Sequence, residues 1–293
     1  MEKTLIYEMW PVQVNNLAEK GKQLEQIKEL GATHVWLRTN KRTTLEPYKN
    51  IADAINVEKL YGNKEEFASF IKEVHEYDLK VIIDLDVNIP AENEEDYDDQ
   101  IRAIRNIATV WFLGYGVDGF YLNAEDLCLP LALNVLNDLF TEPFGPDKVR
   151  PFLVVGCNDS SYSYAFGILK DAPVDLIDDC YLRTQVERKD LKGLVCSISR
   201  DRDISKDSDA PKAAVSLETY GSQRIGDLLG ESSSKVAEAL FMNGPDSIIL
   251  YQGQELGEKN VNMNWINDYN NQSKDKNSPL TWYLFYIGLW KNN

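Results

Sequence analysis

The sequence lacks several features that would assign it to a common class. No apolar run approaches the roughly 20 residues that a membrane-spanning helix needs, and no signal-peptide pattern precedes the first apolar stretch near Leu5. Only 2 His are present, and the 4 Cys show no C-x-x-C spacing. We therefore expect neither a metal site nor a bound cofactor. The missing targeting segment leaves two alternatives, a cytosolic protein or a fragment of a longer one.

Positive charge is also scarce. The 293 residues include 47 acidic and 31 basic side chains, which gives a net charge of -16. Such a surface repels phosphate backbones and anionic lipid headgroups, so we expect no nucleic-acid partner. The hydrophobic content of 43% is ample for a buried core, and the length fits one large α/β barrel or two smaller domains. We predict a single barrel domain that spans residues 1–293.

Short β-rich segments alternate with amphipathic helical stretches along the whole chain. The predicted strands are Leu5–Trp10, His34–Leu37, Val81–Asp86, Gly119–Leu122, Phe152–Gly156, Leu176–Ile177, Ala213–Leu217 and Ser247–Tyr251. The predicted helices are Leu17–Leu30, Lys64–Tyr77, Gln100–Leu113, Leu131–Phe140, Tyr162–Leu169, Gln185–Cys196, Ser222–Met242 and Pro279–Trp290. The charged segment Arg200–Pro211 is typical of a surface loop. Eight strands, each followed by a helix, predict a (β/α)8 barrel.

Six motifs in chain order resemble the barrel strands of the α-amylase family of glycoside hydrolases. They are Ile6–Pro11, Leu30–Leu37, Tyr61–Phe67, Leu79–Asp84, Gly116–Ala124 and Tyr251–Gly257. The resemblance covers nearly the whole chain and implies an α/β fold, an α-amylase-like (β/α)8 TIM barrel. We expect a barrel without the family's third-loop domain, since the link after the third strand is short, and without its C-terminal β-sandwich, since the sequence stops within or just past the predicted eighth helix.

In that family, the catalytic acids follow strands four, five and seven. At the corresponding positions this sequence has Asn123 for the nucleophile, Cys157 for the acid/base and Gly221 for the stabilising Asp. A retaining glycosidase needs two carboxyl groups about 5–5.5 Å apart, and these residues supply none. Tyr121 also stands in place of a family Arg, and Ile89 in place of a sugar-binding His. The resemblance therefore predicts no catalytic residue and a degenerate, inactive enzyme.

An inactive barrel of this kind is similar to the ectodomain of the heavy subunit of heteromeric amino acid transporters. That resemblance implies the extracellular domain of a type II membrane glycoprotein at the plasma membrane. The implied partner is a multi-span amino acid permease, the light subunit, which the heavy subunit traffics and stabilises. The two chains would be linked through an upstream Cys that this chain does not contain. Assembly into a homo-oligomer is left open.

The loops after the strands carry further candidate sites. Two N-x-S/T triplets, which begin at Asn158 and Asn271, are the predicted glycosylation sites. Both follow barrel strands, so we expect them on the former active-site face. Three cysteines follow strands four, five and six, which leaves open a disulfide between two of them at the same face of the barrel. They are Cys128, Cys157 and Cys180.

Two other functions remain open. One is a soluble carbohydrate-binding barrel that kept a sugar-binding cleft. The other is an active glycosidase whose catalytic carboxylates have moved to new positions. Glu125, Asp126, Asp159 and Glu218 lie near predicted strand ends and are the candidates for such relocated acids.

Overall fold

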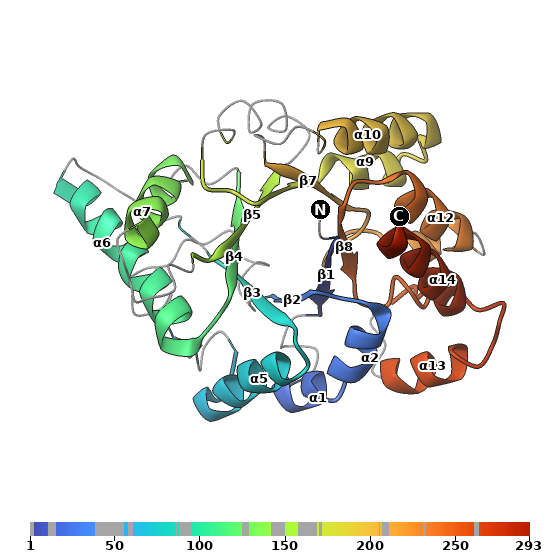
Figure 1. Cartoon of the computed structure of the whole chain (residues 1–293), viewed down its shortest axis with the longest axis horizontal. Helices are drawn as coiled ribbons and strands as arrows, with labels where there is room; N and C mark the ends of the chain where they lie inside the picture. Colours follow the sequence, from blue (N-terminus) through green and yellow to red (C-terminus); the bar gives the residue numbers. More distant parts are fainter. Residues whose placement is uncertain are drawn as a thin grey trace.

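Eight parallel strands close into a barrel in which each strand pairs with its neighbours in sequence and β1 pairs with β8 (Figure 1). The computed structural model describes residues 3–10, 16–38, 56–57, 61–85, 87, 95–124, 129–141, 150–157, 169, 172–204, 206, 211–230, 233–260 and 264–293. The strands are β1 (Thr4–Met9), β2 (His34–Leu37), β3 (Lys80–Asp84), β4 (Gly119–Asn123), β5 (Phe152–Cys157), β6 (Leu176–Asp179), β7 (Lys212–Ser216) and β8 (Ser247–Tyr251). The predicted (β/α)8 fold is confirmed.

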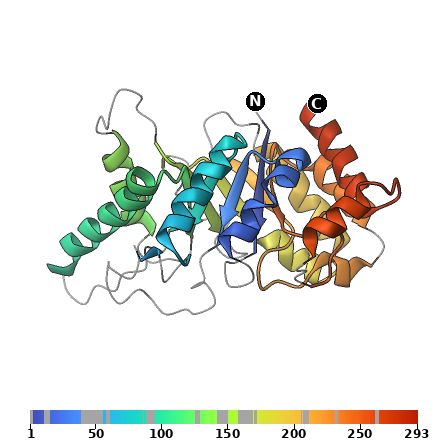
Figure 2. The same cartoon turned by 90° about the horizontal axis from the view of Figure 1, so that it is seen from below.

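Helices surround the barrel, and both chain ends lie on the same side of it (Figure 2). They are α1 (Leu17–Gly21), α2 (Leu24–Leu30), α5 (Lys64–Glu76), α6 (Glu95–Thr109), α7 (Leu129–Thr141), α9 (Tyr181–Glu187), α10 (Leu191–Ile204), α11 (Ile225–Leu229), α12 (Ser233–Asn243), α13 (Trp265–Gln272) and α14 (Pro279–Asn292). A π-helical segment, η1 (Val110–Gly114), extends α6. Each helix with an apolar stripe covers the outside of the barrel with that stripe.

Several predicted helices differ from the observed ones. The predicted helix Leu17–Leu30 is divided into α1 and α2, and the helix predicted over Ser222–Met242 is divided near Gly230, whose φ of 58° lies in the left-handed region. Helix α10 continues to Ile204, into a segment predicted as a loop, and α13 was not predicted at all. Most of Tyr162–Leu169 lies outside the described residues.

Inward and outward side chains alternate along the strands, as the two-residue period of a strand requires. The outward residues join the large core between barrel and helices. The inward residues form a separate apolar layer across the barrel, here called the plug layer. It consists of Ile6, Trp36, Ile82, Tyr121, Val154, Leu176, Ala214 and Ile249. This layer makes the barrel a packed core and closes it beneath its C-terminal end.

A repeated side-chain cap secures the N-terminal end of the barrel. Thr33 Oγ1 accepts a hydrogen bond from the backbone N–H of Leu5 at 3.1 Å. Asp118 Oδ2 accepts one from Val81 N at 2.7 Å, and Asp175 Oδ2 accepts one from Leu153 N in β5 at 2.8 Å. In each case the residue before an even-numbered strand satisfies a donor of the odd-numbered strand beside it. This end of the barrel therefore serves stability, as is usual for the fold.

Candidate functional site

The inward positions change from apolar to polar two residues beyond the plug layer. At or next to the C-terminal end of each strand, these positions carry Glu8, Arg38, Asp84, Asn123, Gly156, Asp178, Ser216 and Tyr251. Alternation along the strands places them on the barrel side of the sheet. Three carboxylates and a guanidinium therefore meet at the end where barrel enzymes carry out their chemistry.

Glu8 and Asp84 contact the same guanidinium from different strands. Arg38 Nη1 donates to Glu8 Oε1 at 2.9 Å, and Arg38 Nε lies 3.6 Å from Asp84 Oδ2. Thr219 Oγ1 donates to Glu8 Oε1 at 2.6 Å, and Trp36 Nε1 donates to Asp84 Oδ1 at 3.2 Å. Arg38 also lies over the Trp36 ring, 4.6 Å from its centroid. One cation thus bridges two acids at the barrel axis.

Burial has a direct effect on Glu8. The side chain is fully buried, and this desolvation raises the pKa of its carboxyl, although Arg38 and the Thr219 hydroxyl oppose the shift. The oxygen Oε2 is buried with no hydrogen-bond partner in the described part of the chain. A buried carboxyl of raised pKa at the end of a barrel strand has the properties of a proton donor.

Asp178 forms a second polar cluster on the opposite side of the axis. Its Oδ2 accepts hydrogen bonds from the Tyr121 hydroxyl and from Arg183 Nη2, both at 2.7 Å, and its Oδ1 accepts one from the Ser216 hydroxyl. The Tyr121 ring stacks on Trp36 with a centroid distance of 3.9 Å. The fully buried Asp178 is therefore held as an ion pair with Arg183, and Tyr121 joins this cluster to the plug layer.

The three positions aligned with the family's acids do not converge. Asn123 ends β4 and is half-buried. Cys157 is fully buried among outward residues of the main core, since it follows the inward Gly156. Gly221 is exposed, with a φ of 86° that disfavours any residue with a side chain. That no catalytic group acts at these positions stays a prediction.

One of the four candidate relocated acids, Glu218, lies within the described residues. Glu218 is 1% exposed, and its Oε2 accepts a hydrogen bond from the backbone N–H of Ile225, the first residue of α11, at 2.7 Å. Burial raises its pKa to about 7, while Arg224, 3.4 Å from Oε1, opposes the shift. Glu218 thus holds the start of α11. The other three candidates, Glu125, Asp126 and Asp159, lie outside the described residues.

Of the remaining predicted sites, some lie within the described residues and some lie outside them. Asn271 is exposed near the end of α13, a helix rather than the loop expected there, and glycosylation at this site stays a prediction. Asn158 and Cys128 lie outside the described residues. Cys157 and Cys180 follow neighbouring strands but are both free, because Cys157 points outward while Cys180 Sγ lies 3.5 Å from the inward Asp178.

In the part of the chain that the structure describes, no three His, Cys, Asp or Glu side chains are grouped so as to hold a metal ion. The sequence analysis overlooked Glu8, Arg38 and Asp178 as site residues. Their signal was present in the sequence. Each is a charged residue two positions after an inward apolar residue of a strand, at the place where that strand ends.

Part of the chain is similar to a known protein family. Residues 18–127 match the sequence model of the family described as "Alpha amylase, catalytic domain". Curated protein sequences give no match. The fold is shared with trehalose-6-phosphate hydrolase from Bacillus licheniformis, at 14% identity and a TM-score of 0.74, over 100% of this chain and 84% of that one.

Two further solved structures share the fold. One is a maltogenic α-amylase from Thermotoga neapolitana, with 17% identity and a TM-score of 0.69 over 99% of this chain and 77% of that one. The other is the trehalulose synthase from Pseudomonas mesoacidophila, with 11% identity and a TM-score of 0.75 over 99% of this chain and 84% of that one. All three similar structures are named as carbohydrate-active enzymes.

These findings correct the functional predictions. The transporter heavy subunit is wrong, because the family match and the similar structures are those of amylase-type enzymes. The inactive enzyme is wrong for the same reason, and the predicted extracellular location at the plasma membrane depended on the transporter resemblance and is wrong with it. The physical error was to equate loss of acids at aligned positions with loss of acids at the barrel end, where Glu8, Asp84 and Asp178 lie.

Within the described residues, no helix combines the length and apolarity needed to cross a bilayer. The permease partner and the homo-oligomer stay predictions. The chain has the (β/α)8 fold of the α-amylase catalytic domain, and its residues 18–127 match that family.

Proposed function

We propose that this protein cleaves or transfers glycosidic bonds of small α-glucosides at the C-terminal end of its barrel. Glu8 and Asp84 would act in place of the acids that are missing at the aligned positions. The observation that carries the proposal is the placement of both carboxyl groups against the Arg38 guanidinium, at the barrel axis. The similarity to amylase-type enzymes supports it by analogy of fold.

The two acids have unlike surroundings, as glycoside chemistry requires. That chemistry needs one protonated carboxyl to donate to the leaving oxygen and one carboxylate to act as nucleophile or base. Glu8 is the donor in this proposal, because burial raises its pKa. Asp84 is the carboxylate, since Arg38 and the Trp36 indole N–H balance its charge. Activity should fall as the pH rises through the raised pKa of Glu8.

Access to Glu8 involves the segment after β7. Glu8 is fully buried, and Thr219 and the backbone N–H of Tyr220 both donate to its Oε1. Asp84, by contrast, is 7% exposed. A sugar that reaches Asp84 must therefore displace the Thr219–Tyr220 segment before its glycosidic oxygen contacts Glu8. The proposal thus couples substrate binding to a movement of this segment.

The test is a turnover survey of the purified protein. Nitrophenyl α- and β-glucosides, maltooligosaccharides, trehalose and sucrose would be incubated with wild-type protein and with Glu8→Gln. We expect turnover of at least one α-glucoside, and a loss of at least about 100-fold in Glu8→Gln because the proton donor is removed. Glu76→Gln, an exposed change on α5, is the control. Wild-type protein that hydrolyses or transfers none of these compounds contradicts the proposal.

A further inference from the structure

A cavity of about 490 Å³ lies outside the barrel, between α11, the first turn of α12, the segment after β8 and the start of α14. The lining residues that matter here are Gly230, Ser234, Lys259, Asn277 and Trp282. This space, here called the rim cavity, shares no described lining residue with the polar groups at the barrel axis. Its size is within the range of about 300–1,000 Å³ that is usual for sites of small organic ligands.

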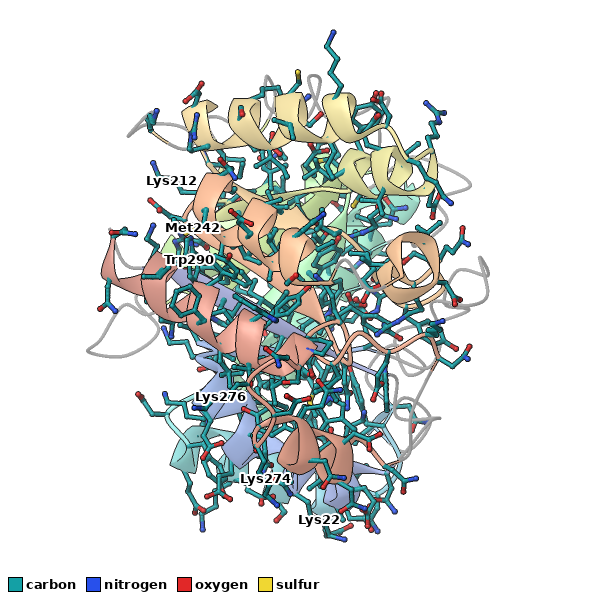
Figure 3. All side chains as sticks on the ribbon, turned by 90° about the vertical axis from the view of Figure 1, so that its right-hand side faces the viewer. Lys22, Lys212, Met242, Lys274, Lys276 and Trp290 are labelled. Carbon is teal, nitrogen blue, oxygen red and sulfur yellow. The ribbon has the colours of Figure 1, made fainter. Side chains whose placement is uncertain are left out.

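The rim cavity is toward the same end of the molecule as the proposed active site. In Figure 3, Lys212 at the start of β7 and Trp290 near the end of α14 both lie toward the left, so the strands begin on that side. Helices α12 and α14 start from the opposite side, and residues of their first turns line the cavity. A ligand in the rim cavity would therefore lie beside the end of the barrel where the strands finish.

Trp282 gives the rim cavity one broad apolar surface. This side chain is 36% exposed, which is high for an aromatic residue of this size. Its ring contacts those of Phe285 and Tyr286 on the next turn of α14, at centroid distances of 6.5 and 6.2 Å. Tyr286 is in turn hydrogen-bonded to Glu238 of α12. These contacts hold the indole in place, so a ligand that packs against it need not order it first.

Three polar side chains line the same cavity. They are the Ser234 hydroxyl, the Lys259 ammonium and the Asn277 amide. Within the described residues, none of the three groups has a hydrogen-bond or ion-pair partner. Together they offer donors of all three kinds and the acceptor oxygens of a hydroxyl and an amide. Such a set matches a ligand that carries several hydroxyl groups.

The lining also argues against other kinds of ligand. None of the described lining residues is acidic, so the cavity lacks the carboxylates that a hard metal ion prefers. A wholly apolar ligand would cover the three polar groups without giving them partners. A sugar ring has an apolar face of C–H groups and a rim of hydroxyls, so it fits both the Trp282 ring and the polar groups. We propose that the rim cavity is a second carbohydrate-binding site, which holds one or two sugar rings.

Gly230 provides the room for such a ring. No described atom lies within 4 Å of the position that a Cβ on Gly230 would take, and its φ of 58° disfavours any residue with a side chain. The cavity wall is therefore bare backbone at this point. A flat ring that packs against Trp282 can extend over Gly230 and reach the polar side chains.

The inference rests on the proposed function in one respect, because it takes α-glucosides as the ligand class. Binding at the rim cavity needs no catalysis, so the two proposals can fail separately. Sugar binding at Trp282 in a protein without turnover would contradict the proposed function alone. Turnover without binding at Trp282 would contradict this inference alone. The binding experiment uses Glu8→Gln protein, or Asp84→Asn if Glu8→Gln does not fold, so that the sugar stays intact.

NMR of the indole N–H groups tests the proposal at the site itself. The chain has 6 Trp, and the signal of Trp282 is the one that disappears in Trp282→Ala. Titration with maltotriose should shift this signal with a Kd of about 1 mM, as expected for a small ligand at a shallow site. Asn277→Ala should weaken this binding by at least about 5-fold, because it removes a hydrogen-bonding partner of the sugar.

Leu289→Ala is the matched control, because Leu289 is equally exposed, at 37%, on the same helix but does not line the cavity. It should bind maltotriose like the parent protein. A Trp282 signal that does not move at about 20 mM maltotriose overturns the proposal. A signal that shifts with inorganic phosphate but not with maltotriose also overturns it and assigns the cavity to an anion. Equal weakening in Asn277→Ala and Leu289→Ala would place the sugar elsewhere.

Discussion

Gly156→Ala should be one of the most damaging single-methyl changes in the barrel. A Cβ at Gly156 would lie 2.0 Å from the Tyr121 hydroxyl oxygen and 2.7 Å from its Cζ. The Tyr121 ring cannot move aside easily, because it stacks on Trp36 at 3.9 Å and its hydroxyl donates to the buried Asp178. The added methyl must therefore break the contact between Tyr121 and Asp178.

The cost can be estimated from the two contacts that are lost. Overpacking of a close-packed interior costs about 1–3 kcal/mol. Loss of a hydrogen bond to a charged group adds about 1.5–3 kcal/mol. We therefore expect Gly156→Ala to lower the free energy of unfolding by about 3–5 kcal/mol, which in a domain of this size corresponds to a fall in Tm of roughly 10 °C.

Urea unfolding followed by circular dichroism measures this difference. Gly114→Ala on η1 is the control, since no described atom lies within 4 Å of its Cβ position, and it should be neutral or slightly stabilising. Tyr121→Leu in the Gly156→Ala background should recover part of the loss, with a coupling of at least about 1 kcal/mol. A loss below 1 kcal/mol in Gly156→Ala, or strict additivity with Tyr121→Leu, would refute this account of the barrel axis.

Two further predictions concern stability. Burial and the neighbouring Asp201 raise the pKa of Asp179 to about 8, so the folded state holds a proton that the unfolded chain has lost, and stability falls as the pH rises from about 4 to 8. Asp201→Asn should flatten this slope in urea titrations at pH 5 and pH 9, and an unchanged slope would contradict the shared proton. Asp118→Ala should cost about 2 kcal/mol, because the N–H of Val81 and the His75 ring lose their acceptor. The exposed Asp99→Ala is its control, and equal losses would show that the cap at the N-terminal end has no special importance.

The barrel itself followed from the sequence because each strand is a short apolar run between polar turns. All eight strands were predicted to within a few residues, since a buried parallel strand has a distinct length and composition. Helix ends were less accurate. The break between α1 and α2 directly follows Gly21, a weak helix former, but the helical spacing of Leu17, Leu24 and Ile27 continues across it and predicts one helix.

The site was harder to predict, for a geometric reason. An alignment fixes which residue follows a strand, but the direction of the side chain depends on strand register. Cys157 shows the difference, because it occupies the aligned position of an acid while its side chain points into the outer core. Glu8 and Asp178 were overlooked because the sequence does not show their long-range contacts. Glu8 of β1 contacts Thr219 in the loop after β7, and Asp178 of β6 contacts Tyr121 of β4.

The pairing of Glu8 and Asp84 across Arg38 is the central claim, and the rate of Asp84→Asn tests it most directly. The substitution keeps the size of the side chain and its contact with the Trp36 indole, but removes the charge. On the best α-glucoside substrate, kcat should fall by at least about 100-fold in protein that circular dichroism shows to be folded. A folded Asp84→Asn protein that retains wild-type kcat would contradict the claim.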